Sequence, residues 1–141
     1  MAFLELDNKT LVADRQLRPD DIEDAAARGV TTIVNNRPDG EEPGQPSSAE
    51  IEAAAGAAGL GYAHIPMPVG GEFSSDKVEA MGEALAQGRV LIFCHSGTRS
   101  TYLWALARAR EGADAGELIR RAGQAGYNIR PLLPWLEKGR S

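Results

Sequence analysis

The chain contains a single cysteine, Cys94, among its 141 residues. A lone cysteine excludes an intramolecular disulfide framework and a zinc site built from several cysteines. Free thiols are typical of a reducing compartment, so we expect the protein in the cytoplasm. The two histidines, His64 and His95, lie too far apart in the chain to form a metal motif. We therefore expect neither a bound metal nor a cofactor.

An excess of basic residues is also missing, since 15 Lys and Arg face 20 Asp and Glu, a net charge of -5. This balance argues against a dedicated nucleic-acid binder. The apolar run at residues 90–94 is far too short to span a bilayer. Residues 1–7 lack the basic start and apolar core of a signal peptide. We expect no nucleic-acid partner and no membrane partner.

The composition, 43% hydrophobic and 25% charged, excludes wholesale disorder. A length of 141 residues corresponds to one ordinary domain, and we expect a single domain over residues 1–141. The segment 131–136 is unusually apolar for its position near the end of the chain. It either packs on the core or binds a partner, and the sequence leaves both open.

Strand signals and helix signals alternate along the chain. Runs of β-branched or apolar residues predict strands at residues 3–6, 11–13, 31–36, 62–65 and 90–93, the first two forming a hairpin. Capping residues, apolar spacing and terminal glycines predict helices at residues 19–29, 47–59, 78–88, 99–110 and 114–126. Alternation of this kind indicates an α/β domain: a mainly parallel sheet with helices on both faces.

The strongest chemical signal follows the buried strand at residues 90–93, in the stretch Cys94-His95-Ser96-Gly97-Thr98-Arg99-Ser100. A strand, a short loop and a helix in this order direct backbone N–H groups and the positive end of the helix at one spot. Arg99 adds a full charge and a planar donor fork. This setting favours the thiolate of Cys94, which is the nucleophilic form. We predict Cys94 and Arg99 as catalytic residues.

The other loop residues are predicted to bind a substrate anion; they are His95, Ser96, Gly97, Thr98 and Ser100. Gly97 permits the tight turn. For His95 the sequence leaves three roles open: a side chain exposed to solvent, one that adjusts the reactivity of Cys94, or one that contacts the molecule accepting the transferred group. Ser100 either donates to the anion or stabilises the start of the helix.

Three further pocket residues are predicted after the strand at residues 31–36, namely Asn36, Arg37 and Asp39. Ligands of parallel α/β sheets bind at the carboxyl ends of the strands, where this segment leaves the sheet. Arg37 would add positive charge that attracts an anionic substrate, the donor of the transferred group. The alternative is a turn held by its own Asn and Asp side chains.

The pattern Cys-x-x-Gly-x-Arg-Ser after an apolar strand resembles the active loop of cysteine phosphatases and rhodaneses. Over residues 11–127 the chain resembles the bacterial family of beta-lactamase-hydrolase-like protein phosphatase-like domains. The matching residues are Gln16, 35–41, Gln45-Pro46, 64–66, 94–100 and 103–105. The resemblance implies a fold like the dual-specificity phosphatases, with Cys94 as nucleophile and Arg99 binding the anion. Members are also described as sulfur transferases and occur fused to sulfide-oxidising enzymes, so a sulfur dioxygenase is a candidate partner.

Two departures from the phosphatase pattern favour sulfur transfer. Cys94 and Arg99 are separated by four residues, whereas phosphatases of this type have five and rhodaneses resemble the shorter loop. The position of the phosphatase general acid falls at about Val69, which cannot donate a proton. Glu72 and Asp39 remain candidate acids.

We therefore predict a rhodanese-like sulfurtransferase. Cys94 would accept a sulfane sulfur from thiosulfate or a persulfide and pass it to an external thiol such as glutathione. The alternative is a cysteine phosphatase, protein-tyrosine or dual-specificity-like, that works through a phosphocysteine. A third interpretation is an inactive loop that binds an anion or a partner protein.

Overall fold

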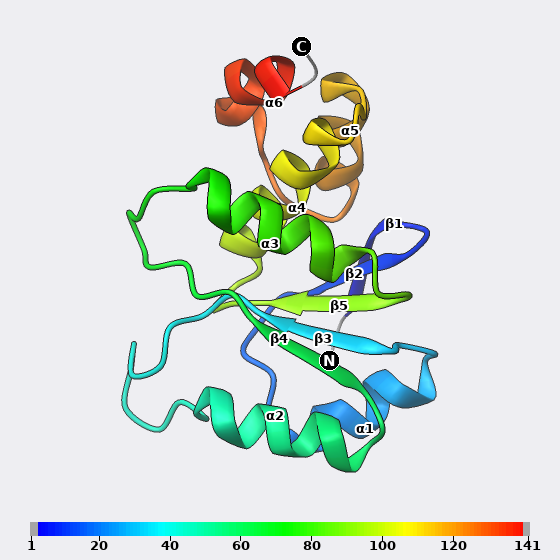
Figure 1. Cartoon of the computed structure of the whole chain (residues 1–141), viewed down its shortest axis with the longest axis vertical. Helices are drawn as coiled ribbons and strands as arrows, with labels where there is room; N and C mark the ends of the chain where they lie inside the picture. Colours follow the sequence, from blue (N-terminus) through cyan, green and yellow to red (C-terminus); the bar gives the residue numbers. More distant parts are fainter. Residues whose placement is uncertain (1–2, 140–141) are drawn as a thin grey trace.

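The computed structural model describes residues 3–139, so the outermost positions of the expected 1–141 domain lie outside the described residues (Figure 1). One five-stranded sheet has the order β1-β2-β5-β3-β4. Its strands are β1 (Phe3–Asp7), β2 (Thr10–Ala13), β3 (Thr32–Asn35), β4 (Gly61–His64) and β5 (Val90–Phe93). β1 pairs with β2 in antiparallel fashion, and the other three pairs are parallel. The predicted mainly parallel sheet is confirmed.

Helices cover both faces of the sheet, as predicted (Figure 1). One face carries α1 (Pro19–Ala27) and α2 (Ser48–Ala57), and the other carries α3 (Ser75–Leu85), α4 (Thr98–Arg110), α5 (Ala115–Gln124) and α6 (Leu133–Gly139). The predicted cap of α2 is present, because the Ser47 side chain accepts a hydrogen bond from the backbone N–H of Glu50. Asp114 caps α5 through the N–H of Glu117 in the same way.

The central strand β5 divides the core into two clusters. Val90 and Ile92 belong to the cluster under α3, α4, α5 and α6, whereas Leu91 and Phe93 belong to the cluster over α1 and α2. All four side chains are fully buried. Because successive side chains of a strand point to opposite faces, a strand buried on both faces reads as a continuous apolar run.

The apolar segment 131–136 folds back on the core. It forms a short 3₁₀ turn, η1 (Arg130–Leu132), followed by α6, which packs on α4. Leu132 and Leu136 are buried in the core cluster, while Trp135 stays 60% exposed. Of the two alternatives left open by the sequence, the structure shows packing on the core.

The three strands β2, β5 and β3 run parallel and end at the same edge of the sheet. Since β5 lies between the other two, the loop that follows it is flanked by the loops after β2 and β3. This edge therefore brings together the segments that hold Gln16, Arg37 and Cys94. Among the described helices, none combines the length and the apolar character needed to cross a bilayer.

Candidate active site

Cys94 is the first residue after β5, and only 1% of its surface is exposed. The backbone N–H of Gly97 donates a hydrogen bond to Cys94 Sγ over 3.2 Å. Gly97 has a φ of 95° and is the N-cap of α4, so the helix begins at Thr98, one residue earlier than predicted. A positive φ favours glycine, and it lets the chain turn back toward the sulfur. Cys94 thus lies at the end of α4 where the helix dipole stabilises negative charge.

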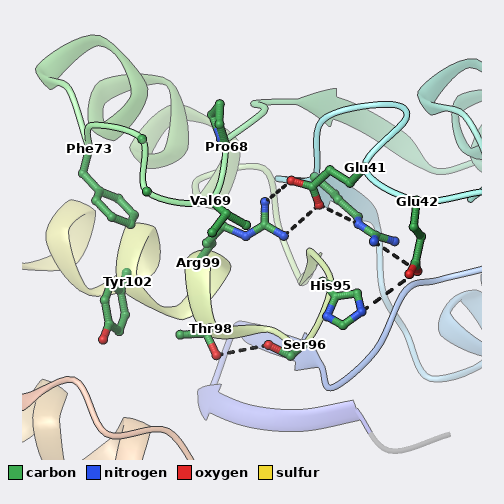
Figure 2. Close-up of a pocket in the computed structure, with 13 residues that line it drawn as sticks. Glu41, Glu42, Pro68, Val69, Phe73, His95, Ser96, Thr98, Arg99 and Tyr102 are labelled. Carbon is green, nitrogen blue, oxygen red and sulfur yellow. Dashed lines mark hydrogen bonds and ion pairs between the residues drawn. The ribbon is translucent and has the colours of Figure 1, made fainter.

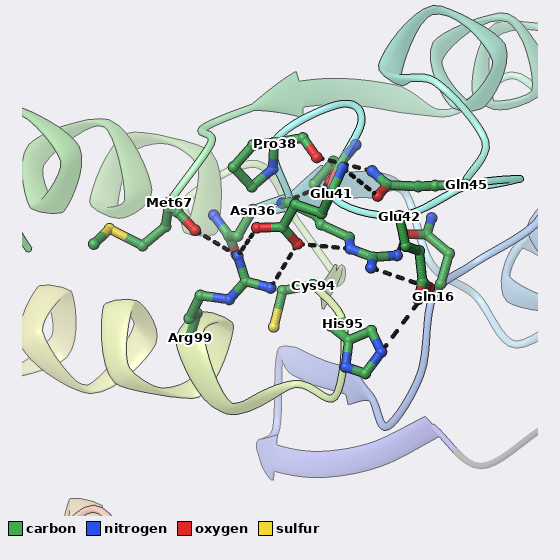
Figure 3. A network of polar contacts seen from close by, with 12 residues as sticks. Gln16, Asn36, Pro38, Glu41, Glu42, Gln45, Met67, Cys94, His95 and Arg99 are labelled. Carbon is green, nitrogen blue, oxygen red and sulfur yellow. Dashed lines mark hydrogen bonds and ion pairs between the residues drawn. The ribbon is translucent and has the colours of Figure 1, made fainter. Parts of the chain in front are cut away.

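The Arg99 guanidinium is held firmly at the mouth of this loop. It donates from Nη1 and Nη2 to the two carboxylate oxygens of Glu41, over 2.8 and 2.9 Å, and from Nη1 to the carbonyl oxygen of Met67 over 2.6 Å (Figure 3). Burial acts to lower the pKa of Arg99, but the Glu41 hydrogen bond and the negative charge of Cys94 outweigh it and raise this pKa. The Arg99 guanidinium is therefore held in place by Glu41 and stays charged beside the nucleophile loop.

Arg37 lies behind this pair and is 2% exposed. Its Nε donates to Glu41 over 2.8 Å, its Nη1 donates to Gln16 over 3.0 Å, and its Nη2 pairs with Glu42 at 3.1 Å. Arg37 thus fixes the position of Glu41, and through it that of Arg99. Binding of an anion by Arg37 itself stays a prediction.

Asn36 and Ser100 form a buried strut beneath the site. Ser100 Oγ donates to Asn36 Oδ1 over 2.7 Å, and Asn36 Nδ2 donates to the Ile65 carbonyl oxygen over 3.1 Å. Both side chains are fully buried. The strut ties the start of α4 to the ends of β3 and β4, and neither residue lines the cavity above the loop.

A cavity of about 710 Å³ opens above the loop (Figure 2). Of the described carboxylates, Glu41 and Glu42 are the ones that line it, and both pair with arginines. The candidate acids lie elsewhere: Asp39 accepts a hydrogen bond from the backbone N–H of Ser48 over 2.7 Å, and Glu72 is exposed outside the cavity.

The remaining loop residues form the rim of the cavity. The His95 side chain is 59% exposed, with Nε2 4.0 Å from Glu42 Oε1, and Ser96 Oγ lies 3.2 Å from Thr98 Oγ1 (Figure 2). His64 instead contacts the Arg37 carbonyl oxygen through Nε2 at 2.9 Å. Within the part of the chain that the structure describes, no group of three metal-ligating side chains converges.

A sequence profile of the family described as "beta-lactamase hydrolase-like protein, phosphatase-like domain" matches residues 4–111. The chain belongs to this family. A beta-lactamase hydrolase-like protein of Xylella fastidiosa is 36% identical over 134 residues, which is 93% of this chain and 31% of that protein. The chain thus spans about a third of the length of the curated relatives it matches.

Solved structures agree with membership of the phosphatase-like domain family. A candidate phosphatase from Neisseria meningitidis superposes with a TM-score of 0.84 at 37% identity, over 99% of both chains. PTPMT1, solved in complex with PI(5)P, superposes with a TM-score of 0.72 at 14% identity, over 98% of this chain and 94% of PTPMT1, a likeness of fold alone. The predicted family and the phosphatase-like fold are confirmed. The comparisons support a phosphatase-like enzyme better than the predicted sulfurtransferase, for which they give no support.

Sequence reasoning missed three contacts of this phosphatase-like domain. Glu41 stands in the run that carries the family resemblance, but nothing in the pattern indicates that it pairs with Arg99. The Met67 carbonyl oxygen has no sequence signal at all. Tyr127 donates from its hydroxyl to the Ser96 carbonyl oxygen over 2.8 Å, from a position beyond the residues that the family profile matches.

Proposed function

We propose that the chain is a cysteine-dependent phosphatase that acts on phosphate monoesters with an acidic leaving group, such as aryl phosphates. One observation carries the proposal: the Gly97 N–H meets Cys94 Sγ at the start of α4, and Glu41 holds the Arg99 guanidinium at the same place. Donors fixed in this way stabilise the charge on a phosphoryl group in transfer. The phosphatase-like family and fold support the same chemistry.

The reaction proceeds in two displacements at phosphorus. The Cys94 thiolate attacks, a bond forms between Sγ and phosphorus, and the bond from phosphorus to the aryl oxygen breaks, so that the aryloxide leaves with the electron pair. Water then attacks the phosphocysteine and the bond from sulfur to phosphorus breaks. The products of this second step are the free thiolate, inorganic phosphate that keeps one proton of the water, and the second proton, which passes to the solvent.

The arrangement of carboxylates limits the leaving groups. The Arg99 hydrogen bond, acting against burial and helped by that of Arg37, lowers the pKa of Glu41, so this carboxyl group is ionised at neutral pH and holds no proton to donate. A general acid contributes roughly 10²–10⁴-fold to rate, and esters of acidic phenols need it least because their aryloxides leave unprotonated. We therefore expect p-nitrophenyl phosphate to be hydrolysed faster than phenyl phosphate.

The test compares phosphate release from p-nitrophenyl phosphate by the parent protein and two variants. Cys94→Ser should abolish release, and Arg99→Lys should lower kcat/KM by about 100-fold or more, since lysine lacks the planar fork. Arg28→Lys is the matched control, because Arg28 pairs with Asp24 on the surface of α1. Release that survives in Cys94→Ser would refute the proposal.

Sulfur transfer is the second candidate, favoured by the four-residue spacing and by the absence of an unpaired carboxyl group among the described residues that line the cavity. The Cys94 thiolate would attack the outer sulfur of thiosulfate, the S–S bond would break, and sulfite would leave with the electron pair. The resulting persulfide would give its outer sulfur to an external thiolate such as glutathione, which restores Cys94. Sulfite leaves as a stable anion, so this reaction needs no proton donor.

Intact mass separates the two candidates. The protein is incubated with thiosulfate or with p-nitrophenyl phosphate, with Cys94→Ser as control. A gain of one sulfur atom that glutathione removes would establish sulfur transfer. No sulfur gain, together with Cys94-dependent phosphate release, would leave the phosphatase.

A further inference from the structure

The cavity above the nucleophile loop has two chemically different ends. One end holds the ionic pairs of Arg99 with Glu41 and of Arg37 with Glu42. The other end is lined by apolar side chains from the loop after β4 and from α4, namely Pro68, Val69, Phe73 and Tyr102. Figure 2 shows Phe73 and Tyr102 on one side of Arg99, and Glu41 and Glu42 on the other.

The apolar end is a well-formed surface. The rings of Phe73 and Tyr102 contact each other with centroids 5.7 Å apart and planes tilted by 42°, and both pack against the core. Val69 stands at the rim with 79% of its surface exposed. When a ligand covers apolar surface that was in contact with water, the burial of this surface favours binding.

The size of the cavity indicates what would cover this surface. A volume of about 710 Å³ lies in the range of pockets that bury small organic molecules, roughly 300–1,000 Å³. An inorganic anion bound to the loop would leave the apolar end of the cavity exposed to water. We propose that Val69, Phe73 and Tyr102 form a subsite for an aryl group joined directly to the anion that the loop binds. This inference rests on the proposed function, which places the anion at Arg99.

The substrate class follows from the subsite. For the phosphatase it is an aryl phosphate, and for sulfur transfer it is an aryl thiosulfonate, which, like thiosulfate, gives its outer sulfur to Cys94 and leaves as an anion, here an arylsulfinate. In both cases the apolar group is part of the leaving group, so its contacts with Phe73 and Tyr102 hold the breaking bond in line with Cys94.

Unreactive sulfonates test the subsite without turnover. Methanesulfonate and benzenesulfonate carry the same anionic head, and calorimetric titration should show that benzenesulfonate binds roughly tenfold more tightly. Val69→Ser and Phe73→Leu should each reduce this preference about threefold. Trp135→Ala is the control, since Trp135 is an exposed aromatic residue outside this cavity.

The outcomes separate the two claims. Equal affinity for both sulfonates, or a preference that both variants keep in full, would overturn the subsite and leave the anion site intact. Absence of binding for both sulfonates would count against the proposed function itself. Val69 is exposed, so its substitution leaves the core packing unchanged and the test does not depend on Phe73→Leu folding.

Independently of the cavity, Tyr127 contacts the back of the nucleophile loop. Tyr127 follows α5, and its hydroxyl donates to the Ser96 carbonyl oxygen over 2.8 Å. A Cβ added at Gly97 would clash with this hydroxyl, so the tyrosine packs directly on the loop backbone. Burial, followed by the charges of Cys94 and Asp14, raises the pKa of Tyr127 to about 12, and the hydroxyl remains protonated at neutral pH.

The Ser96 carbonyl and the Gly97 N–H belong to one peptide unit, which is planar and trans. Its carbonyl accepts from Tyr127, and its N–H donates to Cys94 Sγ. The two groups of a trans peptide point in opposite directions, so a partner that holds the carbonyl also aims the N–H. We infer that Tyr127 is a positioning residue, which keeps the Ser96–Gly97 peptide directed at the nucleophile.

Alkylation of Cys94 by iodoacetamide, followed as a function of pH, tests this role because only the thiolate reacts. Tyr127→Phe removes one oxygen atom, and we expect the half-maximal rate to move to higher pH by roughly 0.5–1 unit. Tyr62→Phe is the matched control, because the Tyr62 hydroxyl forms hydrogen bonds with Ser48 and Asn35 and makes none with the nucleophile loop. A Tyr127→Phe profile that coincides with the parent profile, or a shift of equal size in Tyr62→Phe, would overturn the inference.

Discussion

Glu41 and Arg99 form a two-point ionic pair, with both carboxylate oxygens accepting from the guanidinium over 2.8 and 2.9 Å. The two residues are 58 positions apart in the chain. Glu41 lies in the loop after β3, and Arg99 lies in the first turn of α4. The pair therefore joins the loop after β3 to the start of α4 at the carboxyl edge of the sheet.

Replacing Glu41 should impair catalysis through Arg99. Glu41→Gln keeps the shape of the side chain but removes the charge and one acceptor, so the guanidinium loses its fixed orientation. We expect kcat/KM for aryl phosphates to fall about 10–100-fold, the effect of roughly 1.4–2.7 kcal/mol in the transition state. Glu117→Gln is a matched control, since Glu117 also pairs with two arginines but on the exposed surface of α5. An equal loss in both variants would contradict a specific role for Glu41.

Gly97→Ala should disrupt the loop. The added Cβ would clash with the Tyr127 hydroxyl and approach the Ala13 carbonyl oxygen to 2.9 Å, and backbone atoms yield little. Gly112→Ala is the control, because Gly112 has a similar φ of 101° with no neighbouring atom within 4 Å of its Cβ position. In urea unfolding, Gly97→Ala should cost about 1–3 kcal/mol more than Gly112→Ala. Equal costs would show that the loop accommodates the methyl group.

The buried strut between Asn36 and Ser100 should appear as a coupling energy. Ser100→Ala and Asn36→Ala each leave a buried polar group without its partner, and each should lower the free energy of unfolding by about 1–3 kcal/mol. The double variant should lose roughly 1 kcal/mol less than the sum of the two single losses. Strict additivity in denaturant titrations would contradict the contact.

Asp7 should make part of the stability dependent on acid. Burial acts to raise its pKa, but hydrogen bonds from Trp104 and Lys9 and the charge of Arg108 prevail and lower it below the ordinary value of 3.8. A lowered carboxyl pKa contributes stability above pH 3.8, and this contribution is lost as the pH falls through the lowered value. Asp7→Asn should therefore lose less stability than the parent between pH 5 and pH 3.

The measurement is thermal unfolding across this pH range. Asp24→Asn serves as the control for Asp7→Asn, because Asp24 forms a surface pair with Arg28. At pH 7 we expect Asp7→Asn to cost about 1–3 kcal/mol, since the carboxylate accepts from Trp104 and Arg108 in a partly buried position. Parallel pH curves for parent and Asp7→Asn would be evidence against this assignment.

The sequence was sufficient wherever the signal is local. The apolar run before Cys94 predicts a buried strand, and Ser47 followed by Glu50 predicts the start of α2; both are confirmed. The placement of Cys94 at the end of a strand and beside a helix start also follows from neighbouring residues alone. These features depend on periodicity and capping, which short stretches of chain determine.

The sequence does not predict which polar side chains pair with one another at the site. Anion binding by Arg37 stays a prediction, but the sequence does not indicate that its guanidinium contacts Gln16, Glu41 and Glu42. These contacts depend on the strand order, which sets the loops after β2 and β3 on either side of β5. Alternation of strands and helices predicts a parallel sheet but does not specify which strands are neighbours.

The docked state of Arg99 has a thermodynamic consequence. A free arginine side chain carries about 2 kcal/mol of rotamer entropy, and most of it is lost when the guanidinium is clamped. In this protein Glu41 and the Met67 carbonyl oxygen already clamp it, so the loss belongs to folding. An anion that reaches the loop encounters a rigid cation, and association is spared the cost of immobilising a mobile one.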